Sequence, residues 1–96
     1  MITSTTTSGF AFELDPAAVT DMLFFDVLCE ITDEKTETFD KFKYIKLAVD
    51  ILVGEEQRKA LYEHIAKTNN GRVPYLALFE ELKEIMAAPG KDAGKN

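Results

Sequence analysis

Apolar residues between positions 17 and 31 do not keep to one side of a helix. A period of 3.6 residues places them on two faces, the first formed by Leu23, Phe24, Val27, Leu28 and Ile31 and the second by Ala18, Met22, Phe25 and Cys29. Only Asp26 and Glu30 mark a clear polar strip between them. A helix that is apolar over most of its circumference has to be covered over most of it, so the pattern predicts a protein that packs against a partner.

The same analysis along the chain predicts four short helices, over residues 16–31, 39–53, 55–68 and 74–87. Asp15 as N-cap and Pro16 at the first helical position favour the start of the first helix. Thr38 is expected to cap the second helix, and Gly54 to separate it from the third. The dipeptide at 89–90, Pro-Gly, is expected to stop the fourth.

The second predicted helix carries the same surplus of apolar residues. Beside its main apolar side, Tyr44, Leu47 and Ile51 form another, and only a narrow seam of Lys43, Lys46 and Asp50 is polar. The third helix is sparse in apolar residues and the fourth is cleanly amphipathic. We therefore predict a partner-binding surface that draws on both of the first two helices, made of Met22, Phe24, Phe25, Cys29, Tyr44, Leu47 and Ile51.

The composition of the N-terminal segment predicts little regular structure. Residues 1–9 are a Thr/Ser run ending in Gly9, expected to be a flexible arm. Phe10, Phe12 and Leu14 then alternate with other residues, as in a short extended segment, but no second strand-like run follows to pair with it. We expect an all-α fold: one helical domain over 10–88 with an N-terminal extended arm, and a flexible tail over 89–96.

Charge narrows the classes of partner. The formal net charge is −6, from 17 acidic and 11 basic residues, which argues against binding nucleic acid or an anionic membrane. No apolar run approaches the roughly 20 residues of a membrane span, and the N-terminus lacks the pattern of a signal peptide. With a single cysteine, the chain is expected to be cytoplasmic.

Candidate chemistry is sparse. His64, the one histidine, is expected on the solvent side of its helix, and Cys29 is expected to be a small buried hydrophobe. No second histidine or thiolate stands at ligand spacing, and no nucleophile or phosphate-binding motif is present, so we expect no metal, no cofactor and no enzymatic activity. Glu80, Glu81 and Glu84 form an acidic stripe, expected to be solvated or, alternatively, to dock a folded partner.

Four segments carry a resemblance to a known family. They are FAFELD at 10–15, LVGEEQ at 52–57, LYEHI at 61–65 and NGRVP at 70–74, the last leading into an apolar closing helix. Over residues 10–88 the chain resembles the small tail assembly chaperones of long-tailed phages and prophages of Gram-positive bacteria. The Thr-rich start and the Phe24-Phe25 pair do not match that pattern.

The resemblance implies a function as well as a fold. Such proteins are all-helical and non-enzymatic, form homo-oligomers, and coat the tape measure protein in the bacterial host cytoplasm until tail tube protein polymerises around it. An apolar helical surface and a negative exterior suit that role. The alternative is a small acidic adaptor or inhibitor that binds one folded protein through the acidic helix face, and salt dependence would separate the two.

Overall fold

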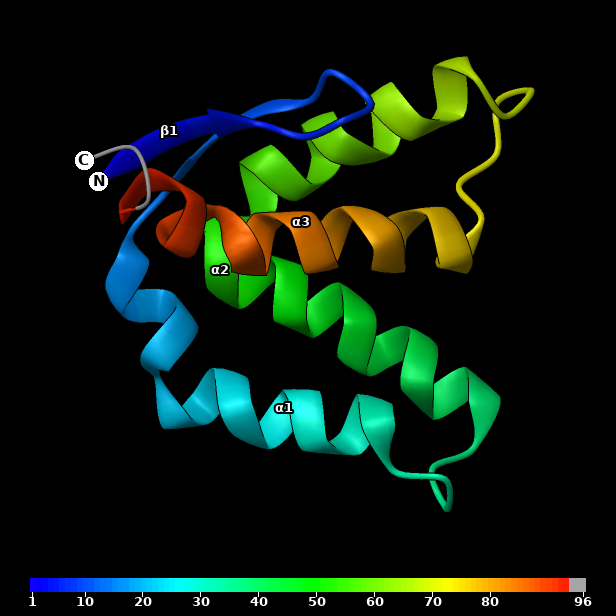
Figure 1. The fold of residues 1–96 in the computed structure, drawn as a ribbon. Helices are drawn as coiled ribbons and strands as arrows, with labels where there is room; N and C mark the ends of the chain where they lie inside the picture. The colour runs from blue at the N-terminus through cyan, green and yellow to red at the C-terminus, as the bar shows by residue number, and fades with distance from the viewer. Residues whose placement is uncertain (94–96) are drawn as a thin grey trace.

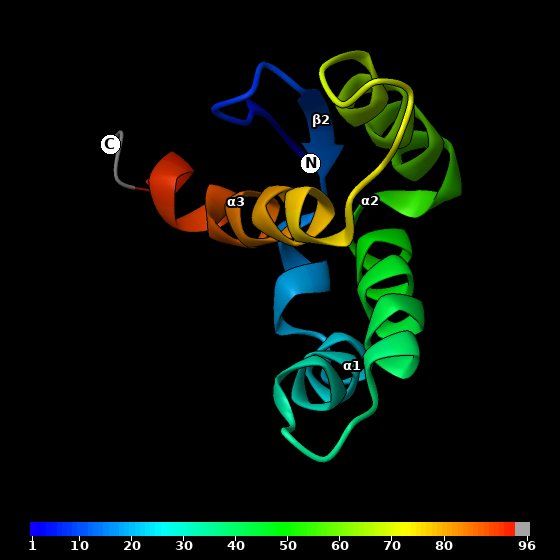
Figure 2. The ribbon, with the colours of Figure 1, turned by 90° about the vertical axis from the view of Figure 1, so that its right-hand side faces the viewer.

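A computed structural model describes residues 1–93 as three α-helices and a small N-terminal hairpin (Figure 1). In chain order the elements are β1 (Ile2–Thr5), β2 (Ala11–Leu14), a 3₁₀ helix η1 (Pro16–Thr20), α1 (Met22–Thr32), α2 (Thr38–Lys67) and α3 (Tyr75–Ala93). Helices α1 and α3 both pack against α2, and the hairpin contacts α2 through β2 and α3 through β1. Figure 2 shows α3 passing between the hairpin above and α1 below.

The N-terminal segment is a β-hairpin: the extended segment expected around Phe12 and Leu14 is present as β2, but the predicted flexible arm and the lack of a partner strand were wrong. Strands β1 and β2 pair antiparallel, with Ile2 opposite Leu14 and Ser4 opposite Phe12. Phe12 and Leu14 are buried, and so is Phe10 just before β2. Threonine is β-branched and well suited to a strand, so a Thr-rich run can form one wherever a neighbouring strand brings the apolar side chains.

The first predicted helix is divided at Asp21. Asp15 does cap the start, its side chain accepting a hydrogen bond from the Ala17 N–H at 3.0 Å, but what begins there is the short η1. Asp21 then acts as a second N-cap and accepts from the Leu23 N–H at 2.8 Å, starting α1. A second capping residue within one helical pattern thus changes the direction of the chain.

The second and third predicted helices follow one another directly within α2, so the structure has three α-helical elements rather than four. The predicted break at Gly54 is confirmed, because its φ of 85° and ψ of 162° are not helical and divide α2 into two helical halves with a kink between them. The predicted cap at Thr38 was wrong: Thr38 is the first helical residue, and Glu37 precedes it without a capping side-chain bond.

Helix α3 extends through Pro89 and Gly90 to Ala93, so the predicted stop at 89–90 was wrong. A proline inside a helix removes one hydrogen-bond donor, but the turn before it is held by the buried Ile85 and Ala88. The predicted flexible tail is therefore helical over 89–93, and its last three residues lie outside the described part of the chain.

The core collects buried side chains from β2 and the three helices, together with Phe10 just before β2. Its members are Phe10, Phe12, Leu14, Phe24, Val27, Ile31, Ile45, Ala48, Val49, Leu52, Leu61, Ile65, Leu78, Leu82, Ile85 and Ala88. Helix α1 gives only Phe24, Val27 and Ile31 to this core, the narrowest contribution of the three helices. Among residues 1–93, no helix combines the length and the apolar character that a membrane crossing needs.

Candidate partner-binding surface

The outward side of α1 carries several large apolar side chains that are exposed to solvent. Met22 is 63% exposed, Leu23 68% and Phe25 52%, and Cys29 is exposed as well. Leu23, which the sequence pattern places on one face with Phe24, is exposed although Phe24 is buried. The expectation that Cys29 is a buried hydrophobe was likewise wrong.

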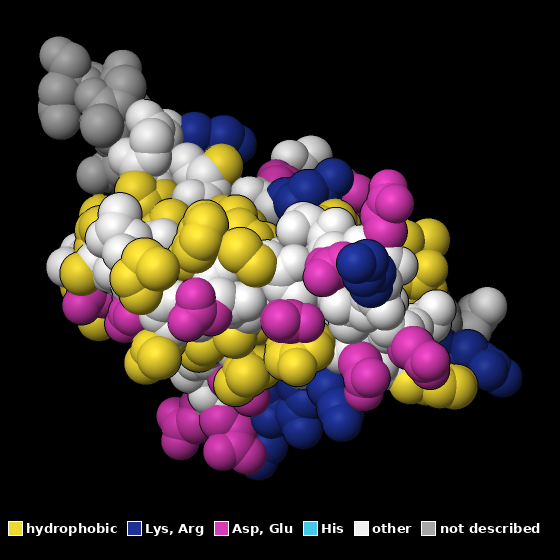
Figure 3. Space-filling model, turned by 90° about the horizontal axis from the view of Figure 1, so that it is seen from below, with side chains coloured by type: hydrophobic (Ala, Val, Ile, Leu, Met, Phe, Trp, Pro, Cys, Tyr) yellow, Lys and Arg dark blue, Asp and Glu magenta, His cyan; other side chains and the backbone are white. Residues whose placement is uncertain are grey.

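Three of these side chains form a continuous line, which we call the α1 strip: Met22, Phe25 and Cys29. Their spacing of three and four residues stacks them on one side of the helix. Asp26 and Glu30 lie beside this line, and Leu23 lies beyond the two carboxylates, which reproduces the polar strip expected from the sequence. Figure 3 views the molecule from the α1 side and shows apolar side chains on both sides of acidic ones.

The predicted partner-binding residues divide into three groups. Met22, Phe25, Cys29 and Leu47 are exposed. Tyr44 and Ile51, on α2, are half-buried and pack against the core. Phe24 is 2% exposed and belongs to the core itself, so a partner could reach it only if α1 unpacked. The prediction of Phe24 as a contact residue is therefore withdrawn, because Phe24 lies with Val27 and Ile31 on the side of α1 that packs into the core.

The acidic stripe of α3 is occupied by the hairpin turn rather than solvated. Glu81 is 5% exposed and accepts hydrogen bonds from the hydroxyls of Thr6, at 2.9 Å, and Ser8, at 2.6 Å. Glu84 accepts from the Thr7 N–H at 2.8 Å and from the Thr7 hydroxyl at 2.7 Å. The Thr7 hydroxyl, and then its N–H, hold the pKa of Glu84 below its ordinary value.

This arrangement reduces the acidic surface on which the alternative function depends. An acidic docking face needs carboxylates directed at solvent, and two of its three members serve the fold. The third, Glu80, pairs with Lys83 at 2.8 Å. The sequence could not reveal this, because the hydroxyls that bind these carboxylates are more than seventy residues away.

His64, on α2, contacts the same hairpin turn and is half-buried, whereas the sequence predicted a solvated histidine. Its Nε2 lies 3.0 Å from the Ser8 hydroxyl oxygen, and its ring centroid is 5.7 Å from that of Phe10. Ser8 already donates its proton to Glu81, so His64 Nε2 is the donor in the histidine–serine bond. A serine nucleophile requires the reverse, a histidine that accepts the serine proton, and this geometry fixes the turn instead.

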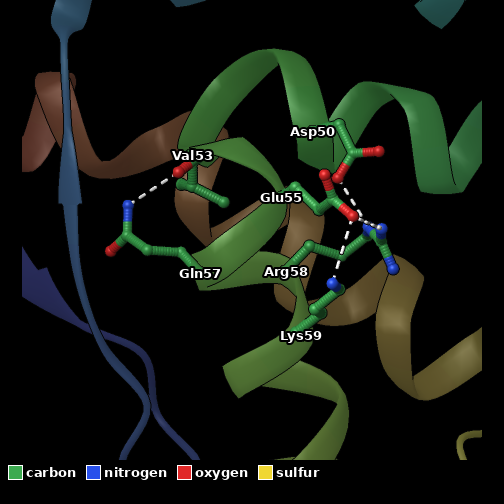
Figure 4. Close-up of polar contacts among 6 residues, drawn as sticks. All are labelled: Asp50, Val53, Glu55, Gln57, Arg58 and Lys59. Carbon is green, nitrogen blue, oxygen red and sulfur yellow. Dashed lines mark hydrogen bonds and ion pairs between the residues drawn. The ribbon is translucent and has the colours of Figure 1, made fainter.

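A cluster of polar side chains fixes the kink of α2 (Figure 4). Arg58, only 8% exposed, reaches across Gly54 to the carboxylate of Asp50, which is the main reason that the pKa of Arg58 is raised. Glu55 pairs with Lys59 at 3.2 Å, and the hydrogen bond from Lys59 lowers the Glu55 pKa. The two halves of α2 are thereby held at one angle, which sets where α1 and α3 lie on them.

A second apolar surface was missed from the sequence, and we call it the α3 groove. It is a hollow of about 280 Å³ where the end of α1 meets the beginnings of α2 and α3. Its apolar lining consists of Ile31, Phe42, Ile45, Tyr75, Leu76 and Phe79. Leu76 was the available signal, since it stands off the predicted apolar face of its helix and is 60% exposed.

Metal binding has no support in the part of the chain that the structure describes. No group of three or more histidine, cysteine or carboxylate side chains among these residues is placed to hold an ion. The candidate binding features of the described residues are therefore two apolar surfaces, the α1 strip and the α3 groove. Comparison with family models, curated proteins and solved structures found no match to this chain.

Proposed function

We propose that this protein is a non-enzymatic assembly chaperone that covers an apolar helical segment of a client with its α1 strip. The observation that carries the proposal is the exposure of Met22, Phe25 and Cys29 in line on a regular helix. Apolar side chains spaced by three and four residues are the usual means by which one helix packs along another. An exposed line of this kind marks a protein interface more often than it marks chance.

The energetics suit a contact that forms and is later released. Burying one phenylalanine or methionine side chain contributes about 1.5–3 kcal/mol, and the strip offers two of them with a cysteine. The binding of a single helix must also offset the lost freedom of the partner, so we expect a weak complex. The acidic neighbours Asp26 and Glu30, with the net charge of −6, keep the exposed surface from aggregating.

The resemblance to tail assembly chaperones gives the proposal a specific form. The client is then the tape measure protein of a phage or prophage tail, held in the bacterial host cytoplasm until tail tube protein displaces the chaperone. In such a setting the chaperone self-associates, and its helices supply many weak contacts along a long client helix. The gene neighbourhood tests this form directly, because a tail tube gene should lie upstream and a very long helix-rich reading frame downstream.

The site itself is tested by one substitution with a matched control. Phe25→Glu places a charge in the α1 strip, whereas Ala60→Glu adds the same charge at an exposed position on the second half of α2. We expect the first variant to lose binding to a synthetic amphipathic Leu/Lys helix, measured by fluorescence anisotropy, and the second to bind as the natural chain does.

Two results would contradict the proposal. One is equal binding of the peptide by both variants. The other is binding that disappears at high salt, because apolar contacts persist as ionic strength rises and acidic docking does not. Circular dichroism of each variant shows whether helicity is retained. Loss of helicity in Phe25→Glu would place Phe25 in the core, which also contradicts the proposal.

A further inference from the structure

We propose that, in the absence of a client, the α1 strip of one copy docks into the α3 groove of a second copy. The inference rests on the proposed function and extends it, because it names a second partner for the same strip. The groove is an apolar hollow, and a lysine that forms no ion pair within the described residues lies beside it, whereas carboxylates lie beside the strip.

The α3 groove suits apolar side chains of a protein partner. It is smaller than the roughly 300–1,000 Å³ typical of pockets for small molecules, and it adjoins a second apolar hollow of about 240 Å³ lined in part by the same rings. Phe42 and Tyr75 lie with ring centroids 4.6 Å apart between the two hollows. Tyr75 and Leu76 at the rim of the groove are exposed, so a docked partner would bury them.

The charges beside the two surfaces are opposite. Asp26 and Glu30 flank the α1 strip, and within residues 1–93 neither forms an ion pair. Lys41 lines the α3 groove and is also without an ion pair in that range. Lys83 lies over the Phe79 ring, 5.4 Å from its centroid, but pairs with Glu80 at 2.8 Å, so of the described residues it is Lys41 that carries the uncompensated positive charge beside the groove. A helix that carries carboxylates beside its apolar strip is therefore the complementary occupant.

Charge also argues against the symmetric alternative. Two α1 strips packed face to face would bring Asp26 and Glu30 of one copy near the same carboxylates of the other, and like charges at an interface are unfavourable. Docking of strip into groove brings carboxylates to Lys41 instead. One chain can present both surfaces at the same time. Ile31, on the buried side of α1, lines the groove, whereas the strip lies on the exposed side of that helix.

Such a contact is small and reversible. A single 11-residue helix against a groove buries less than the roughly 1,200 Å² of a stable interface, so we expect association only at high micromolar concentration. A client helix would then compete with the second copy for the strip. Self-association protects the strip from aggregation and gives way when a client is present.

A mixing experiment separates this arrangement from any symmetric one. Phe25→Glu disables the strip but keeps the groove, and Leu76→Glu disables the groove but keeps the strip. Light scattering after size exclusion should show the natural chain and Ala60→Glu associating, and each of the other two variants monomeric alone. Mixed together, Phe25→Glu and Leu76→Glu should form a species of twice the monomer mass, because one intact strip meets one intact groove.

Three results would overturn the inference: a monomeric natural chain at high micromolar concentration, a mixture that stays monomeric, or a Leu76→Glu variant that associates like the natural chain. Circular dichroism confirms that each variant is folded. The proposed function fails separately. A monomeric natural chain that still binds the Leu/Lys peptide through Phe25 overturns self-docking alone, and a chain that associates but ignores the peptide overturns client binding alone.

Discussion

The side-chain amide of Gln57 bonds to both backbone polar groups of Glu13. The Glu13 N–H donates to Gln57 Oε1 at 2.8 Å, and Gln57 Nε2 donates to the Glu13 carbonyl at 2.9 Å. The same Nε2 donates to the Val53 carbonyl at 2.8 Å, just before the kink of α2. One side chain therefore takes the place of a third strand along β2 and ties the hairpin to the kink. A two-stranded hairpin is marginal by itself, and this bridge anchors it.

Replacing Gln57 should loosen the hairpin. Gln57→Ala removes three hydrogen bonds and leaves the backbone of Glu13 without its partner, so we expect a loss of about 2 kcal/mol in the free energy of unfolding. Urea denaturation followed by circular dichroism measures it. Glu56→Ala, at an exposed neighbouring position, serves as the control and should change the value by less than about 0.5 kcal/mol. Equal effects of the two substitutions would show that the bridge contributes nothing.

A pair of glycine substitutions tests the kink of α2. Gly54 has a φ of 85° and a ψ of 162°, a conformation that almost only glycine adopts, although a Cβ there would meet no atom within 4 Å. Gly54→Ala should therefore cost about 1–3 kcal/mol through backbone strain alone. Gly90→Ala, in the regular backbone of α3 and also in open space, should instead stabilise by about 0.4–1 kcal/mol.

Thermal and urea unfolding of the two variants decide whether that contrast exists. If Gly54→Ala is as stable as the natural chain, α2 straightens without penalty. In that case the arrangement of α1 and α3 on its two halves is not fixed by the kink.

Acid should loosen the hairpin turn from α3. Hydrogen bonds from Thr7 lower the pKa of Glu84, so the folded state takes up this proton less readily than the unfolded state does. Its contribution to stability is complete above the ordinary glutamate pKa of about 4.3 and is lost as the pH falls through the lowered value. The Thr7 amide resonance, followed by NMR from neutral to acid pH, reports the protonation because that N–H donates to Glu84.

Glu84→Gln tests whether this titration belongs to Glu84. The amide side chain keeps an acceptor for Thr7 but has no charge to lose, so the Thr7 resonance should no longer follow the lowered pKa. A midpoint in the natural chain at or above that of an ordinary glutamate would contradict the assignment.

The helical regions were predictable because their signals are local. Helical periodicity and the caps and breaks at Asp15 and Gly54 depend on residues within a few positions of each other. The boundaries failed where a distant or competing interaction decided. Asp21 offered a second cap, and packing of Ile85 and Ala88 carried α3 past its proline. The hairpin was missed because its partner strand has a composition that is typical of disorder.

The candidate surface was predicted in part. The two-faced pattern of α1 identified Met22, Phe25 and Cys29 as more apolar surface than one core can take, and those side chains are exposed. Periodicity could not decide which face of the helix turns inward. Phe24 was therefore included in the predicted partner surface although it is buried, and Leu23 was left out although it is exposed. The α3 groove depends on the meeting of three helix ends, which no single stretch of sequence encodes.

The hairpin has a practical consequence for anyone who expresses this protein. A Thr/Ser-rich leader invites truncation, yet removing residues 1–9 would delete β1 together with the hydroxyls that bind Glu81 and Glu84. The deletion would uncover the apolar side chains of Phe10, Phe12 and Leu14. The truncated chain would then tend to aggregate for a reason unrelated to α1. Aggregation of such a truncated protein would result from damage to the fold and should not be taken as evidence of binding through α1.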